Sequence, residues 1–79
     1  MPNAFERHNA AMREKAVNYS MGIIMRSTDW QEVQHALADH DSFGPWLSDT
    51  YGDADVSECQ SIINEAEERL GDRMPANYG

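Results

Sequence analysis

Apolar residues recur every three or four positions along most of this chain, which is the spacing of one face of an α-helix. The pattern is strictest toward the C-terminal end, where successive heptad a and d positions are Val56, Cys59, Ile63, Ala66 and Leu70. No stretch alternates apolar and polar residues as a half-buried β-strand does. The sequence therefore predicts an all-α fold.

The first predicted helix, from about Asn3 to Arg26, is the longest. Its first apolar stripe has heptad spacing and consists of Phe5, Met12, Ala16, Tyr19 and Ile23. A second stripe lies beside it and consists of Val17, Met21 and Ile24. Because both stripes make this half apolar around much of its girth, the helix is expected to be central or shared with another chain, and the second stripe is a candidate dimer face. Gly22, which costs about 1 kcal/mol relative to Ala in a helix, indicates a closely packed neighbour or a break.

Two shorter helices are predicted in the middle of the chain. Thr28 and Gln31 have the spacing of a capping box, so the second helix is expected to start there and to run to about Ala38. After a polar connection, Pro45 fits the first turn of a short third helix, and Gly52 is expected to end it.

The fourth helix has start and stop signals at both ends. Asp55 and Glu58 resemble a capping box, and Gly71 suits the position just past the last turn. Beyond it, residues 73–79 have no periodic pattern and are expected to be a flexible, mobile tail. Residues 1–72 are expected to form one domain, since a chain of 79 residues holds a single core. Tight polar connections favour a small antiparallel bundle of three to four helices.

Negative charge is concentrated in the C-terminal two thirds of the chain, and the net charge is −8. Residues 1–26 carry four basic and two acidic residues, whereas residues 27–79 carry twelve acidic residues and two arginines. The predicted acidic partner-binding face consists of Glu58, Glu65, Glu68, Asp72, Asp49, Asp53 and Asp55. Such a face suits a basic protein surface, and it disfavours direct binding to nucleic acid or to an anionic membrane. The alternative is a solvated surface that keeps the protein soluble.

Aromatic residues around the Gly44-Pro45 turn form a weaker candidate contact. Trp46 and Tyr51 belong to the residue types that are enriched in interfaces. In so small a domain Trp46 is expected to cap the core, which leaves Tyr51 as the more exposed candidate.

The common signatures of catalysis and cofactor binding are absent from the sequence. There is no nucleophile elbow, phosphate-binding glycine loop or dinucleotide fingerprint. His35 and Asp39 at i,i+4 supply only two ligands on one helix face, and Zn²⁺ requires three or four. Cys59 occupies a core position of the last helix. We therefore predict a non-enzymatic protein with no catalytic residues, no metal site and no cofactor.

The single cysteine excludes an intramolecular disulfide, and the N-terminal residues lack the apolar stretch of a signal peptide. No apolar run approaches the roughly 20 residues that span a bilayer. These features predict a cytoplasmic protein that does not bind membranes.

In size, acidity and lack of catalytic motifs, the chain resembles the small phage-encoded inhibitors of host defence, such as anti-CRISPR and anti-restriction proteins. The resemblance is compositional and assigns no residue a role. It implies an inhibitor that occupies the basic nucleic-acid-binding surface of a partner complex as a partial nucleic-acid mimic. The alternative hypothesis is a helical adaptor or regulatory subunit that acts through homodimerisation or an apolar helix face.

Overall fold

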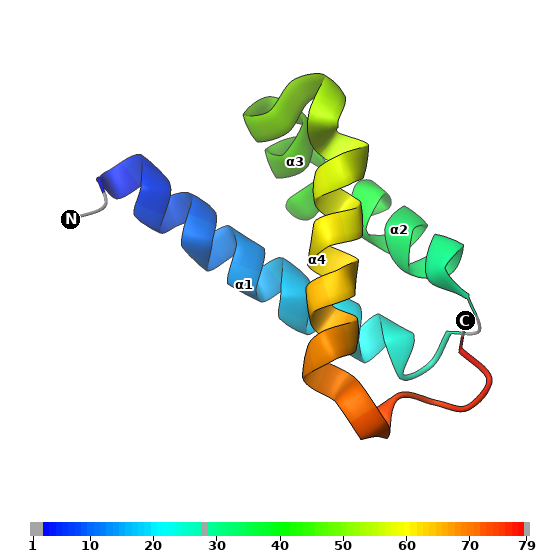
Figure 1. The fold of residues 1–79 in the computed structure, drawn as a ribbon. Helices are drawn as coiled ribbons and strands as arrows, with labels where there is room; N and C mark the ends of the chain where they lie inside the picture. Colours follow the sequence, from blue (N-terminus) through cyan, green and yellow to red (C-terminus); the bar gives the residue numbers. More distant parts are fainter. Residues whose placement is uncertain (1–2, 28, 79) are drawn as a thin grey trace.

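The computed structural model describes residues 3–27 and 29–78. The elements in order are α1 (Ala4–Ile24), α2 (Trp30–Asp39), α3 (Phe43–Tyr51), the 3-10 turn η1 (Gly52–Ala54), α4 (Asp55–Leu70) and the 3-10 turn η2 (Gly71–Arg73). No strand occurs in this part of the chain, so the all-α prediction is confirmed. In Figure 1, α4 crosses the C-terminal half of α1, and the N-terminal turns of α1 extend away from the other helices. The antiparallel bundle stays a prediction.

Side chains cap the first two helices. The Oδ1 atom of Asn3 accepts a hydrogen bond from the backbone N–H of Glu6 at 2.8 Å at the start of α1. At the start of α2, Oδ1 of Asp29 accepts from the N–H of Glu32 at 3.0 Å. The predicted cap, Thr28, lies outside the described residues. The structure assigns the N-cap of α2 to Asp29, one residue later than the sequence pattern predicted.

The predicted capping box of α4 is wrong, whereas both helix-ending glycines are confirmed. Asp55 already has helical dihedral angles (φ −59°, ψ −37°), because η1 leads directly into α4, and an N-cap residue needs a non-helical backbone. Ala54 is the N-cap instead and makes no side-chain capping bond. Gly52 and Gly71 have φ angles of 55° and 52°, in the left-handed region that L side chains avoid.

All four α-helices contribute to one core. Its buried apolar residues are Ala16, Val17, Ile23, Ile24, Val33, Leu37, Phe43, Trp46, Leu47, Cys59, Ile62, Ile63, Ala66 and Leu70. The proposed dimer face is therefore wrong: Val17 and Ile24 are fully buried in this chain, and Met21 packs partly buried against the same core. The physical reason is that both α2 and α4 pack on α1. Homodimerisation through another surface stays a prediction.

The heptad stripes fail at their outer ends. Phe5 is 65% exposed and Val56 is 50% exposed, although both were predicted to face the core. Phe5 belongs to the N-terminal turns of α1, where residues 3–8 are all exposed. Conversely, Ile62 is completely buried beside Ile63 and lies outside the predicted stripe. The core-facing surface of α4 is thus wider than a heptad seam.

The C-terminal residues return to α4. The Tyr78 hydroxyl donates a hydrogen bond to Oε2 of Glu67 at 2.7 Å, and its ring packs partly buried against the core. Burial, together with this bond, raises the pKa of the Tyr78 phenol. This contact joins the last described residue to the helical core. The mobility of residues 73–79 and the domain boundary at residue 72 stay predictions.

Two glycines in helices have opposite surroundings. The backbone of Gly44 lies so close to α2 that a Cβ atom there would overlap the carbonyl oxygen of Ala38. At Gly22, a Cβ atom would meet nothing within 4 Å. The expectation that Gly22 marks a close approach or a break is therefore wrong, because α1 is continuous through it.

These surroundings predict opposite effects of the same substitution. Gly44→Ala should lower the free energy of unfolding by about 1–3 kcal/mol, because α3 must move away from α2. Gly22→Ala should raise it by about 0.5–1 kcal/mol, since alanine favours the helix. Urea denaturation followed by far-UV circular dichroism measures both. A Gly44→Ala protein as stable as the unsubstituted chain would contradict the close packing of α2 and α3.

Candidate interaction surface

Arg13 of α1 binds three side chains of α4 and thereby occupies part of the predicted acidic face. Its Nε lies 3.3 Å from Oε1 of Glu58, and its Nη1 lies 2.9 Å from Oε1 of Glu65. Its Nη2 donates to Oγ of Ser61 at 2.8 Å. All of these side chains except that of Ser61 are partly buried. Glu58 and Glu65, which were predicted to bind a partner, are thus both paired within the chain, and their part in partner binding stays a prediction.

A second arginine extends this network along α4. Arg69 binds both carboxylate oxygens of Glu14, at 2.7 and 2.8 Å, and also lies 2.8 Å from Oε2 of Glu65. The hydrogen bonds from Arg69 hold the pKa of the Glu14 carboxyl below its usual range. Their Coulombic contribution to stability is small, since water surrounds both groups. We call the five residues that alternate in this chain of ion pairs the ion-pair network: Glu58, Arg13, Glu65, Arg69 and Glu14.

The other predicted carboxylates fall into two groups. Glu68 and Asp72 are exposed near the C-terminal end of α4, next in sequence to Arg69 and Arg73. The remaining three form what we call the acidic corner, where α3, η1 and α4 meet: Asp49, Asp53 and Asp55. Asp49 and Asp53 are exposed and Asp55 is half-buried. None of the ion pairs within the described residues involves these three carboxylates.

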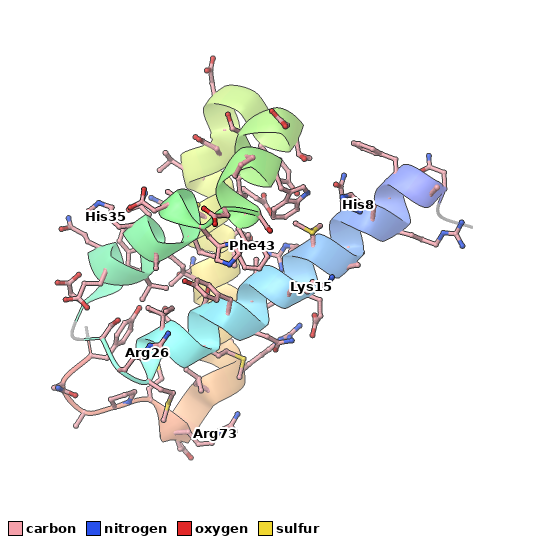
Figure 2. The ribbon with its side chains drawn as sticks, turned by 180° about the vertical axis from the view of Figure 1, so that it is seen from behind. His8, Lys15, Arg26, His35, Phe43 and Arg73 are labelled. Carbon is pink, nitrogen blue, oxygen red and sulfur yellow. The ribbon has the colours of Figure 1, made fainter. Side chains whose placement is uncertain are left out.

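Basic residues lie away from the acidic corner. Neither Lys nor Arg occurs in residues 27–68. In Figure 2, Arg26 and Arg73 lie at the lower end of the view, and α3 runs from Phe43 near the middle toward the upper end. Arg13 reaches the start of α4, but there it binds Glu58. The negative charge of the acidic corner is therefore the least compensated part of the predicted face.

The aromatic candidates are less accessible than a binding hot spot requires. Trp46 is only 7% exposed, and its indole Nε1 donates a hydrogen bond to Oδ1 of Asn9 at 3.0 Å. Tyr51 is half-buried, with its ring edge-on to Trp46 at a centroid distance of 5.7 Å. Burial and the nearby Glu58 carboxylate raise the pKa of the Tyr51 phenol. Trp46 therefore serves the core, and Tyr51 offers only part of its ring to a partner.

A pocket of about 210 Å³ opens beside the acidic corner. Helices α2, α3 and α4 contribute its lining residues, which are Gln34, Ala38, Gly44, Leu47, Ser48, Asp55, Val56 and Cys59. We call it the three-helix pocket. A second hollow, on the outer side of α4, is a wide polar groove that is open to solvent and includes Arg13 and Glu65 of the ion-pair network. The three-helix pocket is the more enclosed of the two.

His40 has a structural role that sequence reasoning missed. Its Nδ1 accepts hydrogen bonds from the backbone N–H groups of Ser42 and Phe43, at 3.0 and 3.2 Å. Its ring stacks on Phe43, with the ring centroids 4.2 Å apart. The side chain of His40 therefore caps the N-terminus of α3. The N-cap residue Ser42 makes no side-chain capping bond itself. The position of His40, two residues before the N-cap Ser42, was the only sequence clue.

The thiol of Cys59 is not activated, and the candidate metal ligands are not grouped to bind an ion. Cys59 is 5% exposed, and burial raises the pKa of its thiol, with Asp55 and Glu58 adding to the effect. The reactive thiolate is therefore disfavoured. Within residues 3–27 and 29–78, no three side chains of His, Cys, Asp or Glu come together in a way that could hold a metal ion.

No protein-family model matches this chain, and no match was found among curated proteins or solved structures. None of the helices in the described part of the chain has the length and apolar character needed to cross a membrane.

Removing the Arg13 guanidinium should loosen the contact between α1 and α4. Arg13→Gln is expected to lower the free energy of unfolding by about 1 kcal/mol, because the partly buried Glu58 loses its cationic partner and Glu65 keeps only Arg69. Lys15→Gln on the same helix removes an equal charge from an exposed side chain and should change stability by less than about 0.5 kcal/mol. Urea denaturation at low and high salt measures the difference, which should shrink with salt. Equal effects of the two substitutions would show that the network contributes no stability.

Proposed function

We propose that this chain is a non-enzymatic binding protein that docks its acidic corner on the basic, nucleic-acid-binding surface of a partner protein and so inhibits that partner. One observation carries the proposal. The carboxylates of Asp49, Asp53 and Asp55 have no ion-pair partner among the described residues, whereas Glu58 and Glu65 do. Within the predicted acidic face, the three carboxylates where α3 passes into α4 are therefore available to a partner, whereas those of Glu58 and Glu65 are already paired.

The local backbone supports a defined arrangement of these carboxylates. Gly52, with its positive φ, ends α3, and η1 leads without a break into α4. Three carboxylates thus lie within seven consecutive residues that have regular helical or turn structure. A preformed acidic surface attracts a basic partner before contact and accelerates association by roughly 10–10³-fold at low salt. It would occupy the same cations that bind nucleic-acid phosphates.

A second candidate function is favoured by a different part of the molecule. The N-terminal turns of α1 project from the other helices, and they carry Phe5 with 65% of its surface exposed. Aromatic residues are enriched in protein interfaces, and an exposed one on a projecting helix end suits contact with another chain. This feature supports the helical adaptor, whose binding would depend on Phe5 and would be insensitive to salt.

Affinity capture from nuclease-treated bacterial lysate, with mass spectrometry at low and moderate salt, separates the two functions. The baits are the unsubstituted chain, the corner variant Asp49→Lys/Asp53→Lys and the matched variant Glu68→Lys/Asp72→Lys. Both variants change the net charge equally. We expect the unsubstituted chain and the matched variant to retain one basic nucleic-acid-binding protein, released by salt or competing DNA. The corner variant should retain at least about tenfold less of this protein.

Three outcomes would contradict the proposal. Retention of the partner by the corner variant would remove the acidic corner from the mechanism. Equal loss of the partner with both variants would show that binding depends only on the net charge of the chain. Capture of a partner that resists salt and depends on Phe5 would establish the adaptor instead.

A further inference from the structure

The three-helix pocket has a buried apolar floor and an exposed rim. Leu47 and Cys59 are 2% and 5% exposed and form the floor. Val56, half of whose surface is exposed, forms a wall. Gly44 lines the pocket with its backbone alone, because α3 lies too close to α2 there for a side chain. Its close approach to α2 keeps these helices together.

The size of the pocket distinguishes between kinds of occupant. Its volume of about 210 Å³ is below the roughly 300–1,000 Å³ of sites that enclose cofactors and drug-sized ligands. A cavity of about 150 Å³ is enough to hold a benzene molecule. The three-helix pocket therefore matches a single apolar side chain of a protein partner, the usual form of an interface anchor.

The charge at the rim indicates what surrounds that side chain. Asp55 lines the pocket, and Asp53 lies two positions before it in η1. Asp49 follows the lining residue Ser48 in α3. One carboxylate of the acidic corner thus lines the pocket, and the other two lie close to its lining residues in the sequence. Cationic side chains on a partner would complement this rim, whereas acidic side chains would be repelled.

We propose that the three-helix pocket is the anchor point of the interface and receives one aliphatic side chain of the partner, flanked in the partner by Lys or Arg. The inference rests on the proposed function, since it assigns the partner of the acidic corner. It adds a contact that charge mimicry alone does not require. Electrostatic attraction to the acidic corner brings the partner in, and burial of the aliphatic side chain against Leu47 and Val56 gives the complex its lifetime.

Two capped pentapeptides test the anchor, with sequences Lys-Arg-Leu-Arg-Lys and Lys-Arg-Ala-Arg-Lys. Both are titrated at low salt into the ¹⁵N-labelled full chain while amide signals are followed by NMR. We expect both peptides to shift the amides of residues 49–55. The leucine peptide alone should also shift Ala38, Gly44 and Val56, and it should bind at least about tenfold more tightly.

Two variants test how much the pocket contributes to peptide binding independently of charge. Ala38→Leu fills the pocket from its rim without altering charge, and Ala11→Leu makes the same change at an exposed position of α1. Ala38→Leu should reduce the affinity of the leucine peptide to that of the alanine peptide, and Ala11→Leu should not. Ser48→Leu replaces Ala38→Leu if circular dichroism shows that the latter does not fold.

The outcomes distinguish the two proposals. Equal affinities of the peptides, or a leucine peptide indifferent to a folded pocket-filling variant, would overturn the anchor and leave the charge-based function standing. Absence of any shift at residues 49–55 with either peptide would overturn both. Tight binding of the leucine peptide that survives Asp49→Asn/Asp53→Asn would retain the pocket but contradict the flanking basic residues.

Discussion

The contact between Arg13 and α4 is the interaction on which the charge arrangement of this protein depends. Helix α4 carries Glu58 and Glu65 on a side that meets α1 and is partly shielded from water. Carboxylates in that position would be costly without a partner. One guanidinium group satisfies both and binds Ser61 between them. The apolar core contributes the larger part of the stability, and Arg13 compensates two negative charges beside it.

This pairing has a consequence for the surface. The chain carries fourteen acidic residues, and those of the ion-pair network are compensated internally. The compensation lies along the contact of α1 with α4 and ends before the turn that joins α3 to α4. The acidic corner and the three-helix pocket both lie at that turn, and they share Asp55. Packing and charge thus bring a pocket with a buried apolar floor and the unpaired carboxylate of Asp55 together on one surface.

Local sequence patterns predicted the helices well, because helix formation and termination depend on neighbouring residues. Gly52 and Gly71 end their helices as expected, and Cys59 lies in the core. Contacts between segments far apart in the sequence could not be predicted from such local patterns. The pattern on α1 could not distinguish a central helix from a dimer face, and the pairs of Arg13 join residues 45 and 52 positions apart. Heptad spacing likewise could not reveal where neighbouring helices stop covering α1, which leaves Phe5 exposed.

Internal ion pairing compensates the carboxylates of Glu58 and Glu65 and leaves those of the acidic corner uncompensated. Amide relaxation by a cationic nitroxide, divided by relaxation from a neutral nitroxide of similar size, maps the local potential directly. We expect a higher ratio at residues 49–55 than at residues 58–65, where Arg13 neutralises the carboxylates. A ratio that is highest along residues 58–65, or uniform over the surface, would contradict it.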